Sequence, residues 1–103
     1  MIKVSVLYPK TADAKFDMGY YCEKHMPMVM ERFGQRCKGM SVDEGLSGGA
    51  PGSDPTYVAA GHFLFDSVGD FQEAFQPHAA EIMSDIPNYT SISPVIQVSQ
   101  VRI

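Results

Sequence analysis

The sequence predicts an α+β fold in which the elements follow one another in the order βαββαβ. Residues 2–8, 56–65 and 92–103 have the alternating or continuous apolar character of β-strands. Two helical stretches, 18–34 and 68–87, each follow a residue that can cap a helix, and each contains an internal proline. We therefore expect two helices to pack on one face of a four-stranded sheet.

The first strand and the first helix have the clearest patterns. One face of the strand at residues 2–8 is apolar and carries Ile2, Val4, Val6 and Tyr8. After a connecting loop at 11–16, Asp17 can cap the helix that follows, and Gly34 supplies a C-terminal stop. Pro27 removes one backbone donor, so we expect it to kink this helix or to split it in two.

Residues 38–46 form the second predicted strand, with a less regular alternation. The following stretch, Gly45–Pro55, is rich in glycine and proline and predicts a surface loop. It lacks the Gly-Lys-Ser/Thr ending of a phosphate-binding loop. The third strand, 56–65, is apolar on both faces, so we expect both faces to be covered.

The last helix and the last strand complete the order. Ser67 can cap the helix, Pro77 interrupts it and Pro87 ends it. In the strand at 92–103 the alternation slips by one residue near Ser99 and Gln100, as a β-bulge would make it do. The order βαββαβ is that of a ferredoxin-like sandwich.

The second face of the predicted sheet has no helix left to cover it. The strand at 56–65 is apolar on that side too, and Leu7 adds to the same surface. A bare apolar sheet face marks an interface. We therefore expect a homodimer in which two copies pack sheet to sheet under two-fold symmetry.

Composition and charge favour some classes of protein and argue against others. A chain of 103 residues with 45% hydrophobic and 19% charged residues fits one ordered domain, residues 1–103. A net charge of −4 without a basic stripe argues against nucleic acid as a partner, and no apolar run is long enough for a membrane span. Cys22 and Cys37 are too far apart along the expected helix to form a disulfide. Two free thiols and no export signal favour the cytoplasm.

Four segments carry a resemblance to a known family: Met1–Pro9, Asp17–Tyr21, Lys24–Pro27 and Pro77–Thr90. The most specific pieces are Lys-His-Met-Pro in the third segment and Pro-His-Ala-Ala-Glu-Ile in the fourth. The chain resembles the EthD family, named for ethyl tert-butyl ether degradation, nearly end to end. The resemblance implies a dimeric α/β barrel, in which two ferredoxin-like units join through their sheets and each keeps a pocket between helices and sheet. The family is associated with an ether-degrading cytochrome P450 system, and this association does not define the reaction of the small protein.

His25 is the first candidate for chemistry. On a helix with about 100° per residue, Met18, Cys22, His25 and Val29 form one stripe that must face inward. An inward imidazole is either a satisfied core group or the ionisable group of a pocket. The resemblance favours the pocket, because relatives of this fold often place a pocket histidine on the first helix. Cys22, on the same stripe, is interpreted as a core residue.

Five further residues are site candidates. Tyr21 lies one turn before His25, so it can line the same side of a pocket, and it is the second catalytic candidate. Tyr8, His62, His78 and Met28 are the ligand-binding candidates. Tyr8 belongs to the strand face assigned to the helices, whereas the side on which His62 lies stays open. His78 follows a helix break and is either a pocket residue or a capping or surface residue. Met28 is one of several methionines on the first helix, which either fill the core or adapt to an apolar ligand.

The sequence supports two hypotheses of different classes. In the first, the protein is an enzyme, and a pocket histidine acts as general base on a small hydrophobic carbonyl compound. A tyrosine hydroxyl then stabilises the negative charge that develops during the reaction. In the second, it is a binding or accessory protein for an oxygenase or degradation pathway and makes no bond itself. The three histidines lack the spacing of metal ligands, so we expect neither a metal nor a cofactor.

Overall fold

A computed structural model describes residues 1–103, and its elements follow the predicted order. The first helix is made of three consecutive segments and the second of two. The strands are β1 (Ile2–Pro9), β2 (Cys37–Glu44), β3 (Tyr57–Phe65) and β4 (Val95–Gln100); the helices are α1 (Met18–Tyr20), a π-helical turn (Tyr21–His25), α2 (Met26–Phe33), α3 (Val68–Phe75) and α4 (Ala79–Asp85). Short 3₁₀ turns at Gly34–Arg36, Gln76–His78 and Ile86–Asn88 follow α2, α3 and α4.

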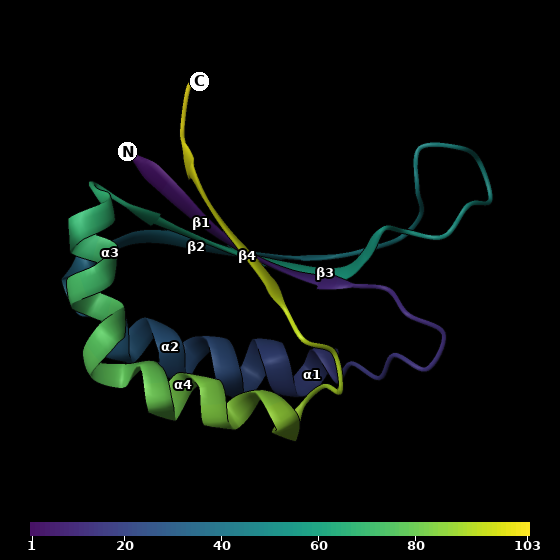
Figure 1. The fold of residues 1–103 in the computed structure, drawn as a ribbon, viewed down its shortest axis with the longest axis horizontal. Helices are drawn as coiled ribbons and strands as arrows, with labels where there is room; N and C mark the ends of the chain where they lie inside the picture. Colours follow the sequence, from purple (N-terminus) through teal and green to yellow (C-terminus); the bar gives the residue numbers. More distant parts are fainter.

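The four strands form one antiparallel sheet in the order β2-β3-β1-β4. All helices lie on one side of this sheet (Figure 1). The predicted ferredoxin-like α+β sandwich is therefore confirmed. The register pairs Val4 with Phe63 and Val6 with Gly61, so these side chains of β1 and β3 face the helices together.

The core lies between the sheet and the helix layer. From β1, Ile2, Val4 and Tyr8 are buried, as the alternation of this strand predicts. At the other end of the core, the ring of Phe33 meets those of Phe63 and Phe65 edge to face, with centroids 5.1 and 5.4 Å apart. This packing fixes α2 over the middle strands and determines where its inward side chains point.

The α-helical hydrogen bonding of the first helix is interrupted just before Pro27, where the sequence predicts a kink or a split. The Asp17 carboxylate caps α1 by accepting the N–H of Tyr20 at 3.0 Å. Because Pro27 has no N–H, the usual helical bond to the carbonyl of residue 23 cannot form. The turn just before it is π-helical, and the N–H of Met26 reaches back to the carbonyl of Tyr21. Gly34 ends α2 with a φ of 66°, in the left-handed region.

The π-helical turn corrects one prediction. Cys22 was expected on the inward stripe, but it is exposed. A turn whose hydrogen bond joins residues five apart shifts the helix phase, so a stripe extrapolated at the α-helical angle fails across it. The inward face instead carries Tyr21, His25, Met26, Val29 and Phe33, all of which are buried.

The second helix follows the prediction, whereas the last strand does not. Ser67 caps α3 by accepting the N–H of Asp70 at 3.1 Å, and Pro77 lies in the 3₁₀ turn between α3 and α4. The bulge expected near Ser99 is wrong, because β4 pairs with β1 without a register shift from Val95 to Gln100. The apparent slip comes from residues beyond Gln100, where the strand has ended.

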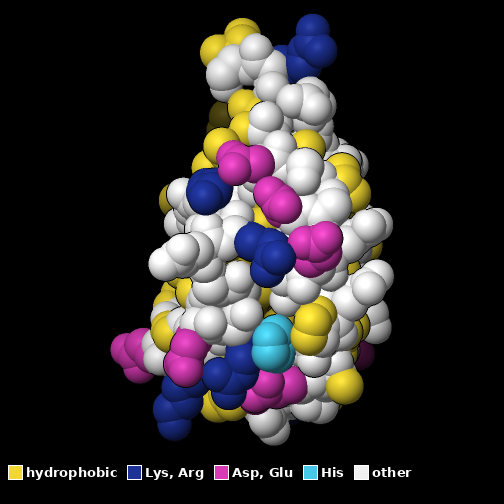
Figure 2. Space-filling view, turned by 90° about the vertical axis from the view of Figure 1, so that its left-hand side faces the viewer, with side chains coloured by type: hydrophobic (Ala, Val, Ile, Leu, Met, Phe, Trp, Pro, Cys, Tyr) yellow, Lys and Arg dark blue, Asp and Glu magenta, His cyan; other side chains and the backbone are white.

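The sheet face away from the helices has no cover within the chain (Figure 1). Leu7, Ala60 and Leu64 are only half-buried there, and Val95 is 50% exposed. Elsewhere the surface is mixed: on the side seen in Figure 2, basic and acidic side chains lie next to one another without a patch of one sign. No helix has the length and apolarity that a membrane crossing requires.

Candidate active site

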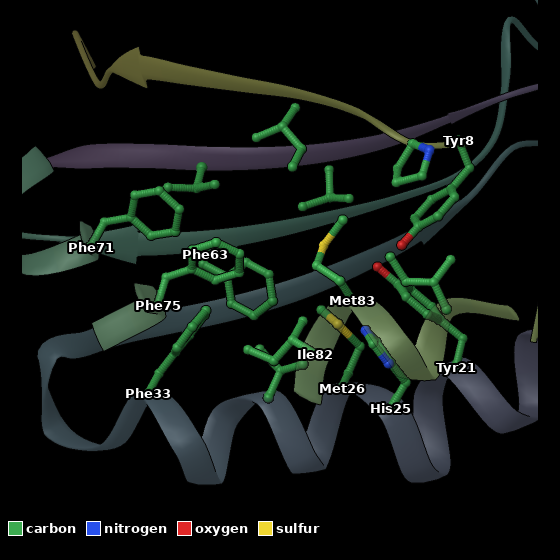
Figure 3. A pocket seen from close by; sticks show the side chains of 16 residues that line it. Tyr8, Tyr21, His25, Met26, Phe33, Phe63, Phe71, Phe75, Ile82 and Met83 are labelled. Carbon is green, nitrogen blue, oxygen red and sulfur yellow. The ribbon is translucent and has the colours of Figure 1, made fainter. Parts of the chain in front are cut away.

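A cavity of about 70 Å³, measured as the space open to the centre of a water-sized sphere, lies between the helices and the sheet and has an open mouth. Figure 3 shows a division within it: Phe33, Phe63, Phe71 and Phe75 gather at one end, and Tyr8, Tyr21 and His25 at the other. His25 is the only lining residue whose ordinary pKa is close to neutral pH. Met83 and Ile96 also line the cavity and are 45% and 50% exposed, which places its mouth between α4 and β4.

His25 is paired with Asp85, the last residue of α4. The imidazole Nδ1 lies 2.8 Å from the carboxylate Oδ2 of Asp85, although 60 residues separate the two. His25 is 4% exposed. The other carboxylate oxygen, Oδ1, accepts the hydroxyl of Tyr20 at 2.7 Å and the side-chain N–H of Asn88 at 2.9 Å. The carboxylate is thus held by three donors from three elements.

The charges of this pair follow from burial and hydrogen bonding. Burial lowers the pKa of His25 below its ordinary value of 6.5, and the hydrogen bond and charge of Asp85 offset this only in part. Burial acts to raise the pKa of Asp85, but the hydrogen bonds from Asn88, His25 and Tyr20 together lower it below its ordinary value. Near neutral pH, His25 is therefore neutral and donates Nδ1–H to an ionised Asp85. The lone pair is then on Nε2.

Three tyrosines lie around the imidazole of His25. The hydroxyl of Tyr89 lies 3.4 Å from Nε2, a long contact, and 2.7 Å from the hydroxyl of Tyr8. The ring of Tyr21 stacks on the imidazole, with centroids 5.6 Å apart and planes 14° from parallel. Burial raises the pKa of Tyr8, Tyr21 and Tyr89, so all three phenols stay protonated and can donate hydrogen bonds.

Three of the six candidates from the sequence meet in this cavity: His25, Tyr21 and Tyr8. Met28 is not among its lining residues and instead borders a polar groove on the outer side of the helices. His78 is half-buried in the turn between α3 and α4 and does not line the cavity either.

His62 lies on the opposite face of the sheet. Its neighbours Gly61 and Phe63 face the helices, so the alternation of β3 turns His62 away from the cavity. There, its Nδ1 is 2.8 Å from the hydroxyl of Ser5, and its Nε2 is 3.3 Å from a carboxylate oxygen of Asp43. This polar trio lies in the middle of the uncovered face.

Two members of the site were missed by sequence reasoning. Neither Asp85 nor Tyr89 is among the candidates that the sequence indicates. Both lie in the segment Pro77–Thr90 that carries the family resemblance, which was the one available signal. Asp85 and Tyr89 are 60 and 64 residues from His25 in the sequence. A contact between residues so far apart leaves no periodic pattern in the sequence. No group of three or more His, Cys, Asp or Glu side chains converges as metal ligands would.

Comparison with known proteins identifies the family. The EthD domain model matches residues 9–93. The chain belongs to the EthD family. A solved EthD-like protein from Ralstonia eutropha JMP134 shares 49% sequence identity over 99% of this chain and 92% of that one, with a TM-score of 0.95. The resemblance to EthD proteins noted in the sequence is therefore confirmed.

More distant structures share the fold with this EthD-family chain. An ethyl tert-butyl ether degradation family protein from Bacillus halodurans C-125 has 15% identity and a TM-score of 0.74, with 99% of each chain covered. A dimeric protein of unknown function with a ferredoxin-like fold, from Bacteroides fragilis NCTC 9343, has 16% identity and a TM-score of 0.53, covering 97% of this chain and 95% of that one. No functionally curated protein matches the chain.

Proposed function

We propose that this EthD-family protein binds a small, neutral, largely apolar carbonyl compound in the cavity and that His25 acts on it as a general base. The observation that carries the proposal is the position of His25: a buried imidazole, held through Nδ1 by Asp85, lies at one end of an apolar cavity. No lysine or arginine lines this cavity, so nothing there would balance a charged ligand.

The proposed reaction is enolisation. Nε2 of His25 takes a proton from the carbon next to the carbonyl, and the C–H electron pair forms a carbon–carbon double bond. The carbonyl π electrons move to oxygen, which becomes an enolate. We expect the protonated phenols of Tyr8 and Tyr21, which line the same end of the cavity, to donate a hydrogen bond to that oxygen. The imidazolium then returns the proton to carbon or to oxygen.

An exchange experiment tests this proposal. β-Tetralone, a neutral ketone fused to an aromatic ring, is incubated with the protein in deuterated buffer, and deuterium incorporation beside the carbonyl is followed by NMR. We expect the protein to accelerate incorporation and His25→Ala to lose about 10²-fold or more of that acceleration. His78→Ala is the matched control, because His78 lies outside the cavity, and it should behave as the unmodified protein. Equal exchange by His25→Ala and the unmodified protein would reject the role of His25.

The second candidate is a binding or accessory protein for an oxygenase or degradation pathway. The apolar character of the cavity favours this candidate, because a cavity lined almost entirely by apolar and aromatic side chains can hold an apolar compound without any chemistry. Saturable binding of β-tetralone without any acceleration of exchange would select it over the enzyme.

We also infer that two copies pair through their uncovered sheet faces. Leu7 and Leu64 flank the polar trio on that face, and Val95 is half exposed at its edge. The pairing would remove this apolar surface from water. The related fold from Bacteroides fragilis is described as dimeric, which supports the inference.

A further inference from the structure

The carboxylate of Asp85 lies at a position where a helix disfavours a negative charge. It is the C-terminal residue of α4, where the helix dipole presents its negative end and disfavours an anion. Its side chain is nevertheless only 18% exposed. An anion placed there must be stabilised by specific donors, and the structure supplies three of them.

The three donors come from both helices. His25, in the π-helical turn, donates to Oδ2, and Tyr20, at the end of α1, donates to Oδ1. Asn88, in the 3₁₀ turn after α4, also donates to Oδ1. Both oxygens are therefore fixed in position, and rotation of the carboxylate would break at least one of these hydrogen bonds.

The π-helical turn brings two of the donors to one carboxylate. Tyr20 and His25 are five residues apart, and the turn between them contains the bond from the Met26 N–H to the Tyr21 carbonyl. In a regular α-helix, residues five apart point in different directions, about 140° apart. The wider turn brings both side chains toward the Asp85 carboxylate. The π-helical turn before Pro27 therefore makes the two hydrogen bonds possible.

We propose that Asp85 is the positioning residue of His25: it selects the tautomer with the proton on Nδ1, aims Nε2 at the ligand, and stabilises the imidazolium that forms when Nε2 takes a proton. Tyr20 and Asn88 keep Asp85 ionised and immobile. The tautomer follows from the 2.8 Å contact between Nδ1 and a carboxylate oxygen, and only the imidazolium step rests on the proposed function.

Asp85 also reaches the opposite side of the helix layer. It borders the polar groove formed with Tyr20, Lys24, Met28, Glu81, Ser84 and Asn88, whereas His25 borders the apolar cavity. The pair thus spans the helix layer, with the imidazole in an apolar environment and the carboxylate at a polar surface. The titratable groups around the pair are Tyr20, Tyr21, Lys24, Glu81, Tyr89 and Tyr8.

The test is a ¹⁵N NMR titration of the His25 ring in the full-length protein, in Asp85→Asn and in the control Asp66→Asn. Asparagine keeps the shape of the side chain and removes its charge, and Asp66 is an exposed carboxylate directly after β3. We expect neutral His25 to carry its proton on Nδ1 in the unmodified protein and in Asp66→Asn. In Asp85→Asn we expect its pKa to fall, because the hydrogen bond and charge that raise it are weakened or lost.

The same variants are then assayed for β-tetralone exchange. We expect kcat to fall by about tenfold or more in Asp85→Asn, with KM little changed, because the ligand does not touch Asp85. Asp85→Glu should recover part of the loss. An unchanged tautomer and an unchanged His25 titration in Asp85→Asn would overturn the proposal, even if His25 proves essential for exchange. A changed titration in a protein that never accelerates exchange would leave Asp85 as the positioning residue and reject the enolisation.

Discussion

A β-carbon on Gly61 would collide with the hydroxyl of Tyr21 and would lie 3.1 Å from the terminal methyl of Met26. The glycine in the middle of β3 therefore allows two inward side chains of the first helix to lie directly on the sheet. Since Tyr21 stacks on His25, the small residue on β3 also fixes the position of the imidazole.

Gly61→Ala should therefore destabilise the protein by roughly 1–3 kcal/mol, because Tyr21 and Met26 must both move. Chemical denaturation measures the loss. Gly69→Ala is the matched control: it lies in α3, its β-carbon would have an ordinary contact 3.8 Å from Ser67, and the change should be neutral or slightly stabilising. A Gly61→Ala variant as stable as its control would show that the contact does not constrain Tyr21.

The hydroxyl pair of Tyr8 and Tyr89 gives a second prediction. Tyr89→Phe leaves the buried hydroxyl of Tyr8 without its 2.7 Å partner, so we expect a loss of roughly 1–3 kcal/mol in unfolding free energy. Tyr57→Phe, at an exposed tyrosine of β3, should cost much less. Equal effects of the two substitutions on the denaturation midpoint would mean that the hydroxyl pair adds nothing to stability.

The third prediction concerns stability against pH. The pKa of His25 is lower in the folded protein than its ordinary 6.5, so the unfolded chain binds the extra proton more readily. The contribution of His25 is therefore complete above about pH 6.5 and is lost as the pH falls toward the folded pKa. Unfolding free energies measured between neutral and acidic pH should decrease over this window. The decrease should be smaller in His25→Gln and unchanged in His78→Gln; the same slope in all three proteins would contradict the predicted shift.

The fold was predictable from the sequence because its signals are local. Asp17, Ser67, Gly34 and Pro27 act within a few residues of themselves, and each behaves as the sequence indicates. The alternation of β1 likewise gives its buried face directly.

The site was predictable only in part, because its decisive contacts are not local. The burial of Tyr21 and the exposure of Cys22 depend on a π-helical turn that shifts the helix phase. The side of His62 stayed open because β3 is apolar on both faces, and only the register with β1 decides it. Asp85 resembles any helix carboxylate until the fold brings it 2.8 Å from His25.

The fourth prediction tests the inferred homodimer. Leu7→Glu places a carboxylate in the middle of the uncovered sheet face, and pairing would bury it without a partner. We expect sedimentation at micromolar concentration to give a dimer for the unmodified protein and a monomer for this variant. Leu46→Glu, at a loop residue that is 89% exposed, is the control and should remain dimeric. A monomer of 11.3 kDa for the unmodified chain would contradict the inferred homodimer.

The most direct test of the central claim, that the cavity between helices and sheet is a ligand site with His25 at its polar end, is an NMR titration of methyl-labelled protein with β-tetralone. The account predicts saturable shifts at the methyl groups of Val4, Val29 and Ile82, together with the ring of His25, all of which line the cavity. Methyls on the uncovered face, such as those of Leu7 and Leu64, should stay unchanged. Shifts confined to that face, or no saturable shift at the cavity residues, would contradict the account.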